Sequence, residues 1–244
     1  MLNGLSVVLA RYGLNLVGTT AIDAYDAGVP PPLGLQRLLP AAKTAIVIGN
    51  GGGAFWVAFR DFCRERPEHE REPDPIDAFT RRAVETAMAT TMDPGAPVRL
   101  LYPFRYPDEP VSFMRLAECA GLGRRSVLGV LIHPRFGPWI ALRAALLVPA
   151  ILTASRPADG FDPCPDCTER ACMAACPAGA VTAAGWNVPR CATHRGQTED
   201  TCAARCHARF DCVIGRPHRY PPDALAYHQR RALAGLASYA SAGT

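Results

Sequence analysis

Residues 164–177 have the sequence Cys164-Pro-Asp-Cys167-Thr-Glu-Arg-Ala-Cys172-Met-Ala-Ala-Cys176-Pro177, which is the most informative stretch of the chain. Its four cysteines are separated by two, four and three residues, and a proline follows the last of them. Thiolates are the ligands of iron–sulfur clusters, and the bacterial pattern C-x2-C-x2-C-x3-C-P sends its fourth cysteine to a second cluster. The spacing therefore predicts a cluster-binding loop that passes single electrons.

The remaining cysteines supply enough ligands for two clusters. The chain has ten cysteines. Two of them, Cys63 and Cys119, stand alone in apolar stretches, where a buried and inert thiol is the usual outcome. The other eight fall between residues 164 and 212, which is the number that two four-cysteine clusters need. They are Cys164, Cys167, Cys172, Cys176, Cys191, Cys202, Cys206 and Cys212.

Two other interpretations of these cysteines remain open, a disulfide framework and a zinc site. Disulfides need an oxidising compartment. The first residues, MLNGLSVVLARYGLNLVG, lack a charged leader and have an arginine within their apolar run. They predict neither a signal peptide nor a membrane span, so we expect a cytoplasmic protein with no membrane partner. Zinc is the stronger rival, because Cys164 and Cys167 could pair with Cys202 and either Cys206 or His207.

The overall charge does not favour nucleic acid as a partner. The formal net charge is +4 with cysteine counted as neutral. A four-iron cluster with four thiolates carries about −2, so two clusters would bring the protein to about zero. Arg195, Arg205, Arg209 and Arg216 lie among the cysteines, where they could offset cluster charge or form a docking face for an acidic electron donor.

The sequence before the cysteines predicts helices alternating with strands, which is typical of a layered α/β or α+β domain. The expected helices cover residues 2–17, 54–65, 75–92, 111–120 and 223–237. The expected strands cover residues 44–49 and 98–104, with a strand pair across 127–152. A linker is expected at 155–160. The predicted domains are a cofactor-binding domain at 1–156, a cluster module at 157–220 and a C-terminal helix and tail at 221–244.

Several segments together resemble a known family. They are LLPAAKTAIVIG at 38–49, PVSFMRLAECAGLGRRSVLGVLIHPRFGPWIAL at 110–142, and the cysteine run. In this order they are similar to the core of the epoxyqueuosine reductases and, more distantly, of the reductive dehalogenases. The resemblance implies an α+β protein with a nitroreductase-like, cobalamin-binding α/β sandwich domain, followed by a ferredoxin-like module with two 4Fe–4S clusters.

The resemblance also implies how the eight cysteines divide between the clusters. In the family the ligand sets are interleaved along the chain. One cluster would take Cys164, Cys167, Cys172 and Cys212. The other would take Cys176, Cys191, Cys202 and Cys206. The later spacings are looser than the first run, so the second set rests more heavily on the resemblance.

The segment 120–139 corresponds to the family's corrinoid-holding region. The resemblance implies contacts to a corrinoid from Gly123, His133, Pro134, Gly137 and Trp139. For His133, a loop histidine satisfied by its neighbours is the alternative. A histidine in this segment could contact the macrocycle directly.

Three glycines, Gly51, Gly52 and Gly53, lie between an expected strand and an expected helix. Residues 49–54 fit the pattern G-x-G-x-x-A, which could place a dinucleotide pyrophosphate at a helix N-terminus. However, no strand ending in an acidic residue follows at the usual distance. A close backbone approach to corrinoid or flavin and a plain tight turn are the other interpretations, since glycine permits both.

Asp108 and Glu109 lie near the position at which epoxyqueuosine reductases have a catalytic acid. Reduction of a polarised bond needs a proton donor, and a partly buried carboxylic acid can serve. The local sequence Pro-Asp-Glu-Pro is also typical of a solvated turn.

These observations predict a reductase that takes low-potential electrons from an external donor, such as a flavodoxin, a ferredoxin or a reductase. The electrons would pass through two 4Fe–4S clusters to a bound corrinoid or its small-molecule substrate. The alternative is a non-enzymatic, ferredoxin-type electron-transfer protein without corrinoid. The tRNA-modifying members of the family carry helical repeats after the clusters. Here only one helix fits before Thr244, so we do not expect nucleic acid as a partner.

Overall fold

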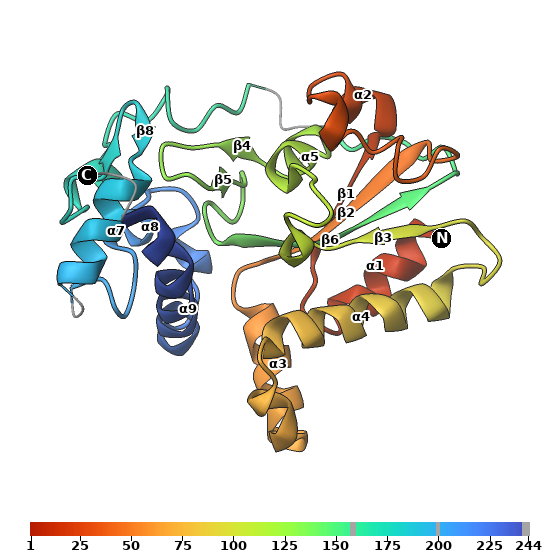
Figure 1. Ribbon diagram of the computed structural model, residues 1–244, viewed down its shortest axis with the longest axis horizontal. Helices are drawn as coiled ribbons and strands as arrows, with labels where there is room; N and C mark the ends of the chain where they lie inside the picture. Colours follow the sequence, from red (N-terminus) through yellow and green to blue (C-terminus); the bar gives the residue numbers. More distant parts are fainter. Residues whose placement is uncertain (157–159, 199–200, 241–244) are drawn as a thin grey trace. The chain divides into compact units, whose positions relative to one another are not determined.

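The computed structural model describes residues 1–156, 160–198 and 201–240 (Figure 1). The chain forms two compact units. The N-terminal unit contains Met1–Gly123 and Ala141–Asp159, and the C-terminal unit contains Arg124–Ile140 and Gly160–Thr244. These units differ from the contiguous division expected from the sequence, because residues 124–140 pack with the C-terminal unit. Residues 157–159 of the expected linker lie outside the described residues.

A four-stranded sheet organises the N-terminal unit, with strand order β1-β2-β6-β3. Strand β1 (Leu16–Ala21) pairs antiparallel with β2 (Thr44–Gly51), and β3 (Arg99–Leu101) pairs antiparallel with β6 (Ile140–Val148). Every residue of β2 is buried. This burial explains why its first residues form a continuous apolar run rather than an alternating pattern.

Helices cover this sheet and supply an aromatic core. They are α1 (Leu2–Ala10), α2 (Ile22–Asp26), α3 (Ala54–Glu65), α4 (Pro75–Thr91) and α5 (Phe113–Cys119). On α3, Phe55 and Phe59 are four residues apart and therefore share one face. Both rings contact Phe79 of α4, with centroids 5.4 and 5.8 Å away. Proline at the first position of α4 fixes its start, because the amide it lacks has no helical partner there.

The C-terminal unit consists of short elements around the cysteines. They are β4 (Arg124–Arg125), β5 (Leu131–Ile132), α6 (Ala171–Ala174), β7 (Val181–Thr182), β8 (Gly185–Trp186), α7 (Val188–Gln197), α8 (His207–Phe210) and α9 (Pro222–Ala240). Strands β4 and β5 form one antiparallel pair, and β7 and β8 form another. The longest helices, α7 and α9, pack against each other.

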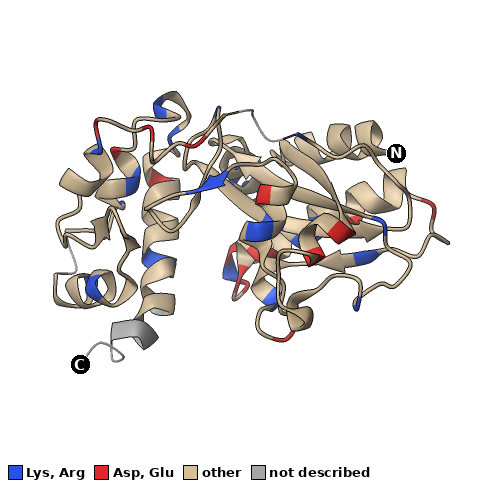
Figure 2. Ribbon diagram, turned by 90° about the horizontal axis from the view of Figure 1, so that it is seen from above, with Lys and Arg blue, Asp and Glu red and all other residues tan. Residues whose placement is uncertain are grey.

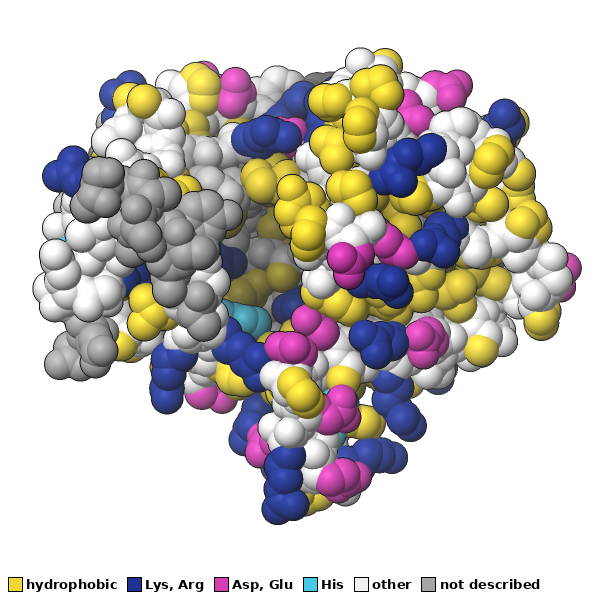
Figure 3. Space-filling view, viewed as in Figure 1, with side chains coloured by type: hydrophobic (Ala, Val, Ile, Leu, Met, Phe, Trp, Pro, Cys, Tyr) yellow, Lys and Arg dark blue, Asp and Glu magenta, His cyan; other side chains and the backbone are white. Residues whose placement is uncertain are grey.

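Charges of both signs are spread over the molecule (Figure 2). On the face shown in Figure 3, basic and acidic side chains are interspersed with apolar ones. On α3 and the following 3-10 helix at Pro67–Arg71, for example, Arg60 pairs with Glu70 and Arg64 pairs with Asp61. Among the described residues, no helix combines the length and hydropathy needed to cross a membrane.

The structure confirms the α+β class and most helices predicted from the sequence. Helix α3 covers the expected residues 54–65, and α4 ends one residue before the expected limit. The helix predicted for residues 2–17 is wrong beyond Ala10, because Leu16 begins a strand. The expected strand pair across 127–152 is also wrong, since β5 pairs with β4 rather than with β6.

Candidate functional site

Four cysteines from two segments of the C-terminal unit surround one hollow. Cys164, Cys167 and Cys172 belong to the first cysteine run, and Cys212 follows α8. We call these four residues the first cysteine group. The hollow has a cavity volume of about 30 Å³, and much of its wall is apolar. The apolar side chains include Val127, Leu128, Ile132, Met173, Val213 and Ile214.

The backbone of the first run bends so that its three cysteines face one space. The Cys167 N–H donates a hydrogen bond to the Cys164 carbonyl at 3.3 Å. Arg170 has φ 45° and is the one non-glycine residue with positive φ in the described part of the chain. This conformation costs about 1–2 kcal/mol and is concentrated at functional sites. Helix α6 begins directly after it and carries Cys172 into the wall of the hollow.

The β4–β5 hairpin forms a wall that sequence reasoning did not foresee. The Ser126 hydroxyl donates to the Val130 carbonyl at 2.6 Å and accepts the Leu128 N–H at 3.2 Å. These bonds fix the hairpin tip and place Val127 and Leu128 against the hollow. The local sequence indicates only a short turn at Gly129, and it does not indicate that this turn packs against the distant cysteines.

A close backbone contact holds the other side of the hollow. Gly137 has φ +58° and Gly215 has φ +73°. A Cβ atom on Gly137 would lie 2.0 Å from the Ile214 carbonyl oxygen, and one on Gly215 would lie 2.3 Å from the Phe136 carbonyl carbon. Only glycine permits this approach at both positions. It anchors Ile214, which follows Cys212 by two residues.

The other four cysteines form the second cysteine group, Cys176, Cys191, Cys202 and Cys206. Cys176 follows α6, and its Sγ accepts the Ala180 N–H at 3.3 Å. Cys191 lies on α7, Cys202 is buried, and Cys206 precedes the first residue of α8.

The electrostatics of the thiols show the same two groups. Burial raises the pKa of Cys172, and charge on Cys212, Cys164 and Cys167 raises it further. Burial also raises the pKa of Cys212, to which Cys164 and Cys167 add. Each of these cysteines therefore has its electrostatic neighbours within the first group.

Burial likewise raises the pKa of Cys202, with further increases from Cys206, Cys191 and Cys176. It also raises the pKa of Cys206, where Cys191 and Cys176 add to the effect. A raised pKa keeps these thiols protonated, and a cationic centre would be required to hold them as thiolates. Cys172 and Cys212 thus have Cys164 and Cys167 as electrostatic neighbours, and Cys202 and Cys206 have Cys191 and Cys176. That each set of four holds one cluster stays a prediction.

The geometry bears on the kind of metal. In the described ranges, no three His, Cys, Asp or Glu side chains are placed to hold a single metal ion. A zinc ion needs its ligands about 2.0–2.3 Å from one point. A four-iron cluster is larger and takes its four thiolates around its outside. The first group supplies four thiols from two segments around one hollow, which is the donor set that one four-iron cluster takes.

The glycines expected to approach a cofactor form a turn that protein groups complete. The Asn15 side-chain amide donates to the Gly51 carbonyl at 3.0 Å, and its oxygen accepts the Gly51 N–H at 2.7 Å. Gly52 has φ +69°, and Gly53 directly precedes α3. These contacts explain the turn without a ligand, and a cofactor role for Gly51–Gly53 stays a prediction.

His133 has the contacts of a loop histidine. Its Nδ1 accepts the backbone N–H of Arg135 at 3.0 Å and that of Phe136 at 3.2 Å. Burial lowers the pKa of the imidazole, and the positive charges of Arg135 and His218 lower it further. A neutral ring is what these two bonds require, because Nδ1 must act as an acceptor.

The other residues expected at a corrinoid divide between the two units. Gly123 is buried in the N-terminal unit with φ +145°, whereas Pro134 is exposed in the C-terminal unit. Trp139 has no exposed surface, and its ring centroid lies 6.4 Å from that of Phe210 and 5.5 Å from that of Tyr220. Their corrinoid contacts stay predictions.

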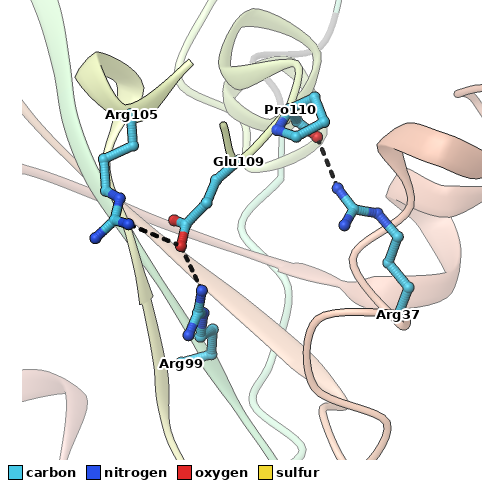
Figure 4. Close-up of polar contacts among 5 residues, drawn as sticks. All are labelled: Arg37, Arg99, Arg105, Glu109 and Pro110. Carbon is cyan, nitrogen blue, oxygen red and sulfur yellow. Dashed lines mark hydrogen bonds and ion pairs between the residues drawn. The ribbon is translucent and has the colours of Figure 1, made fainter. Parts of the chain in front are cut away.

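Glu109, one of the two candidate acids, is anchored by arginines (Figure 4). Its Oε1 pairs with Arg99 and lies 3.6 Å from an Arg105 nitrogen. The side chain is 12% exposed, and Oε2 is buried with no hydrogen-bond partner among the described residues.

Asp108, the other candidate acid, is exposed. On the far side of Glu109, Arg37 donates to the Pro110 carbonyl at 3.1 Å (Figure 4). The arginine contacts hold this loop to the N-terminal unit, so Glu109 has an evident structural role. The catalytic assignment of both acids stays a prediction.

No protein-family model and no curated protein matches the sequence. Solved structures do match. An epoxyqueuosine reductase from Streptococcus thermophilus is 14% identical with a TM-score of 0.57, over 99% of this chain and 81% of that one. An epoxyqueuosine reductase solved with an epoxyqueuosine-modified tRNA stem loop is 16% identical with a TM-score of 0.54, over 90% and 66%.

The C. elegans B12-trafficking protein CblC is 15% identical with a TM-score of 0.59, over 100% of this chain and 98% of that one. Reductive dehalogenases also match, but their TM-score of 0.41 is too low to support an inference. The chain therefore shares its fold with the epoxyqueuosine reductases and CblC. This confirms, at the level of fold, the relationship that the sequence segments predicted.

Proposed function

We propose that this protein is an iron–sulfur reductase with two 4Fe–4S clusters, which serves a bound corrinoid or its substrate. The observation that carries the proposal is the division of eight cysteines into two groups of four within the C-terminal unit. When bound, such clusters supply one-electron transfer at low potential. An external donor, such as a flavodoxin, a ferredoxin or a reductase, would provide the electrons.

The protein's own residues would hold, shield and tune the clusters. In the ferredoxin-like module that we propose, the first group would hold one cluster, and the apolar hairpin residues Val127 and Leu128 would exclude water from it. The second group would hold the other. Burial, hydrogen bonds to sulfur and nearby charge are what set a cluster's potential.

The corrinoid part of the proposal rests on the shared fold. The structures with this fold include a B12-trafficking protein and epoxyqueuosine reductases. We propose the N-terminal unit as a nitroreductase-like domain, with Glu109 as the proton donor to a small-molecule substrate. A tRNA stem loop belongs to one similar structure, and we do not extend that partner to this chain.

The cluster proposal is tested by metal content after anaerobic reconstitution. We expect about eight iron ions and eight acid-labile sulfides per chain, four for each cluster. Cys172→Ser and Cys202→Ser should each lose about half of them, and the double variant nearly all. Cys212→Ser combined with Cys172→Ser should lose no more than either alone, because both lie in one group. Cys119→Ser is the matched control and should lose none. Colourless protein containing zinc would refute the proposal.

The corrinoid proposal is tested by titration with hydroxocobalamin. Saturable shifts of its visible bands, followed by formation of Co(I) with dithionite, would support it. Protein with a full iron complement that leaves these bands unchanged would refute the corrinoid part alone.

A second candidate function is electron transfer without a corrinoid. It is favoured by the contacts of the expected corrinoid residues, since Gly51 is held by Asn15 and Gly137 packs against Ile214. Trp139 is likewise buried between aromatic rings. The hydroxocobalamin titration separates the two candidates.

A further inference from the structure

Two arginines lie beside the second cysteine group and are held in place by carbonyl oxygens. The first is Arg195, which is only 5% exposed and donates to the Gln229 carbonyl at 2.6 Å. It follows Cys191 by four residues on α7, so the two side chains are neighbours on one face. Its charge favours the thiolate of Cys202. Among the described residues, no carboxylate forms an ion pair with Arg195.

The second arginine is Arg209, on α8. Its Nε and Nη2 both donate to the Pro138 carbonyl, at 3.1 and 2.6 Å. Its guanidinium carbon lies 4.9 Å from the Trp139 ring centroid and 5.2 Å from that of Tyr220. Its backbone N–H and its charge both favour the thiolate of Cys206. Carbonyl and aromatic contacts fix the guanidinium in position without neutralising it.

The first cysteine group has a different electrostatic environment. Arg170 lines its hollow and is exposed. Arg216 is half exposed and lies 3.6 Å from the carboxylate of Glu169. Charges in water are screened and act weakly on a neighbouring site, whereas buried charges act strongly. Among the described arginines, the buried one is Arg195, and it lies at the second group.

We propose that Arg195 and Arg209 are fixed positive charges that raise the reduction potential of a cluster in the second group above that of a cluster in the first group. This inference rests on the proposed function, because it requires a cluster in each group. Reduction of a 4Fe–4S centre adds one electron, and with it one negative charge, without making or breaking a covalent bond. A fixed positive charge stabilises the reduced form, so the electron settles on the second group before the first.

The test is an anaerobic redox titration of the reconstituted full chain with dithionite, followed by EPR spectroscopy. Two reduction waves are expected. Cys172→Ser, which alters the first group, and Cys202→Ser, which alters the second, assign the waves. In Arg209→Gln the midpoint potential of the higher-potential wave should fall by at least about 59 mV, which is a tenfold change in the equilibrium constant of a one-electron reduction. The lower wave should stay in place.

Three further variants separate charge from structure. Arg209→Lys keeps the charge and should restore most of the shift. Arg195→Gln should move the same wave in the same direction, and it provides a second variant if Arg209→Gln fails to fold. Arg216→Gln removes a half-exposed, ion-paired charge near the first group and should move neither wave measurably.

The results distinguish this inference from the proposed function. An iron content that shows no second cluster would refute the proposed function itself. Two full clusters whose waves stay unchanged in both Arg195→Gln and Arg209→Gln would overturn the inference and leave the proposed function intact. Assignment of the higher wave to the first group would also overturn it.

Discussion

Replacing Gly137 by alanine tests whether this glycine serves the packing of the cysteine module or the approach of a cofactor. Gly137 has φ +58°, and a Cβ atom there would lie 2.0 Å from the Ile214 carbonyl oxygen. The left-handed backbone costs an alanine about 1–2 kcal/mol. Forced displacement of a packed neighbour costs about 1–3 kcal/mol more. We therefore expect Gly137→Ala to lower the free energy of unfolding by about 2–5 kcal/mol.

The same change should also disturb the first cysteine group. Ile214 lines the hollow and follows Cys212 by two residues, so a displaced Ile214 carbonyl moves the Cys212 segment. The reconstituted variant should hold about half of the wild-type iron. Denaturant unfolding gives the stability, and iron and sulfide analysis gives the cluster content.

Gly160→Ala is the matched control. Gly160 has φ +65° in the same unit, but apart from its chain neighbours no atom of the described residues lies within 4 Å of the position of its Cβ atom. It should show the backbone cost of about 1–2 kcal/mol alone and keep its iron. If Gly137→Ala instead matches Gly160→Ala in stability and iron content, and loses only cobalamin binding, the packing argument is refuted and the cofactor role is supported.

Three other substitutions each test one side chain and its contacts. Burial lowers the pKa of His133 below 6.5, so the unfolded chain binds the proton more readily and unfolding becomes easier as the pH falls below about 6.5. His133→Gln should reduce that acid-side loss when unfolding is compared at about pH 7.5 and pH 5.5, and an unchanged pH dependence would contradict this. Asn15→Ala removes both side-chain bonds to Gly51 and should cost about 1–3 kcal/mol with no change in iron; lost iron would count against it. Arg99→Gln removes a half-exposed arginine from the largely buried Glu109 but leaves Arg105 beside the same oxygen, so it should cost less than about 1 kcal/mol; a larger loss in thermal unfolding would contradict this.

Local periodicity was sufficient to predict the helices whose apolar face is continuous. Helix α3 is the clearest case, because Phe55, Phe59 and Cys63 recur at intervals of four residues and are all buried. Its start follows the glycine turn, and its end precedes a 3-10 helix that begins with Pro67. Each of these signals lies within the segment itself, so no distant contact was needed to find it.

The strand β1 could not be found in this way. Its residues continue an apolar pattern from α1, which is why a single helix over 2–17 was expected. The helix ends because Gly13, with φ +70°, lies so close to α3 that a Cβ atom would be 2.3 Å from the Phe55 nitrogen. The strand exists because it pairs with β2, a partner far along the chain.

For the candidate site too, local sequence patterns predict some residues, and others depend on distant contacts. The spacing of Cys164, Cys167 and Cys172 is a local pattern that predicts shared ligation. That Cys212 completes their group depends on how the chain returns after α8, and only the family resemblance indicated it. The arginine partners of Glu109 are equally non-local, since Arg99 lies on β3 and the sequence gives no sign that it faces this loop.

The cysteine-rich sequence after residue 156 does not form a complete folding unit by itself, because it packs with the hairpin segment at residues 124–140. Residues 124–140 belong to the C-terminal unit, although α5 and most of β6, which flank them, belong to the N-terminal unit. A chain divided at residue 156 would part Trp139 from Phe210 and Tyr220, and would expose apolar rings that the intact chain buries. It would also remove Val127 from the hollow of the first cysteine group. A dry wall is part of what sets a cluster's potential. With the proposed clusters bound, the segment before the cysteines would therefore contribute to the potential of the first cluster as well as to the stability of the unit.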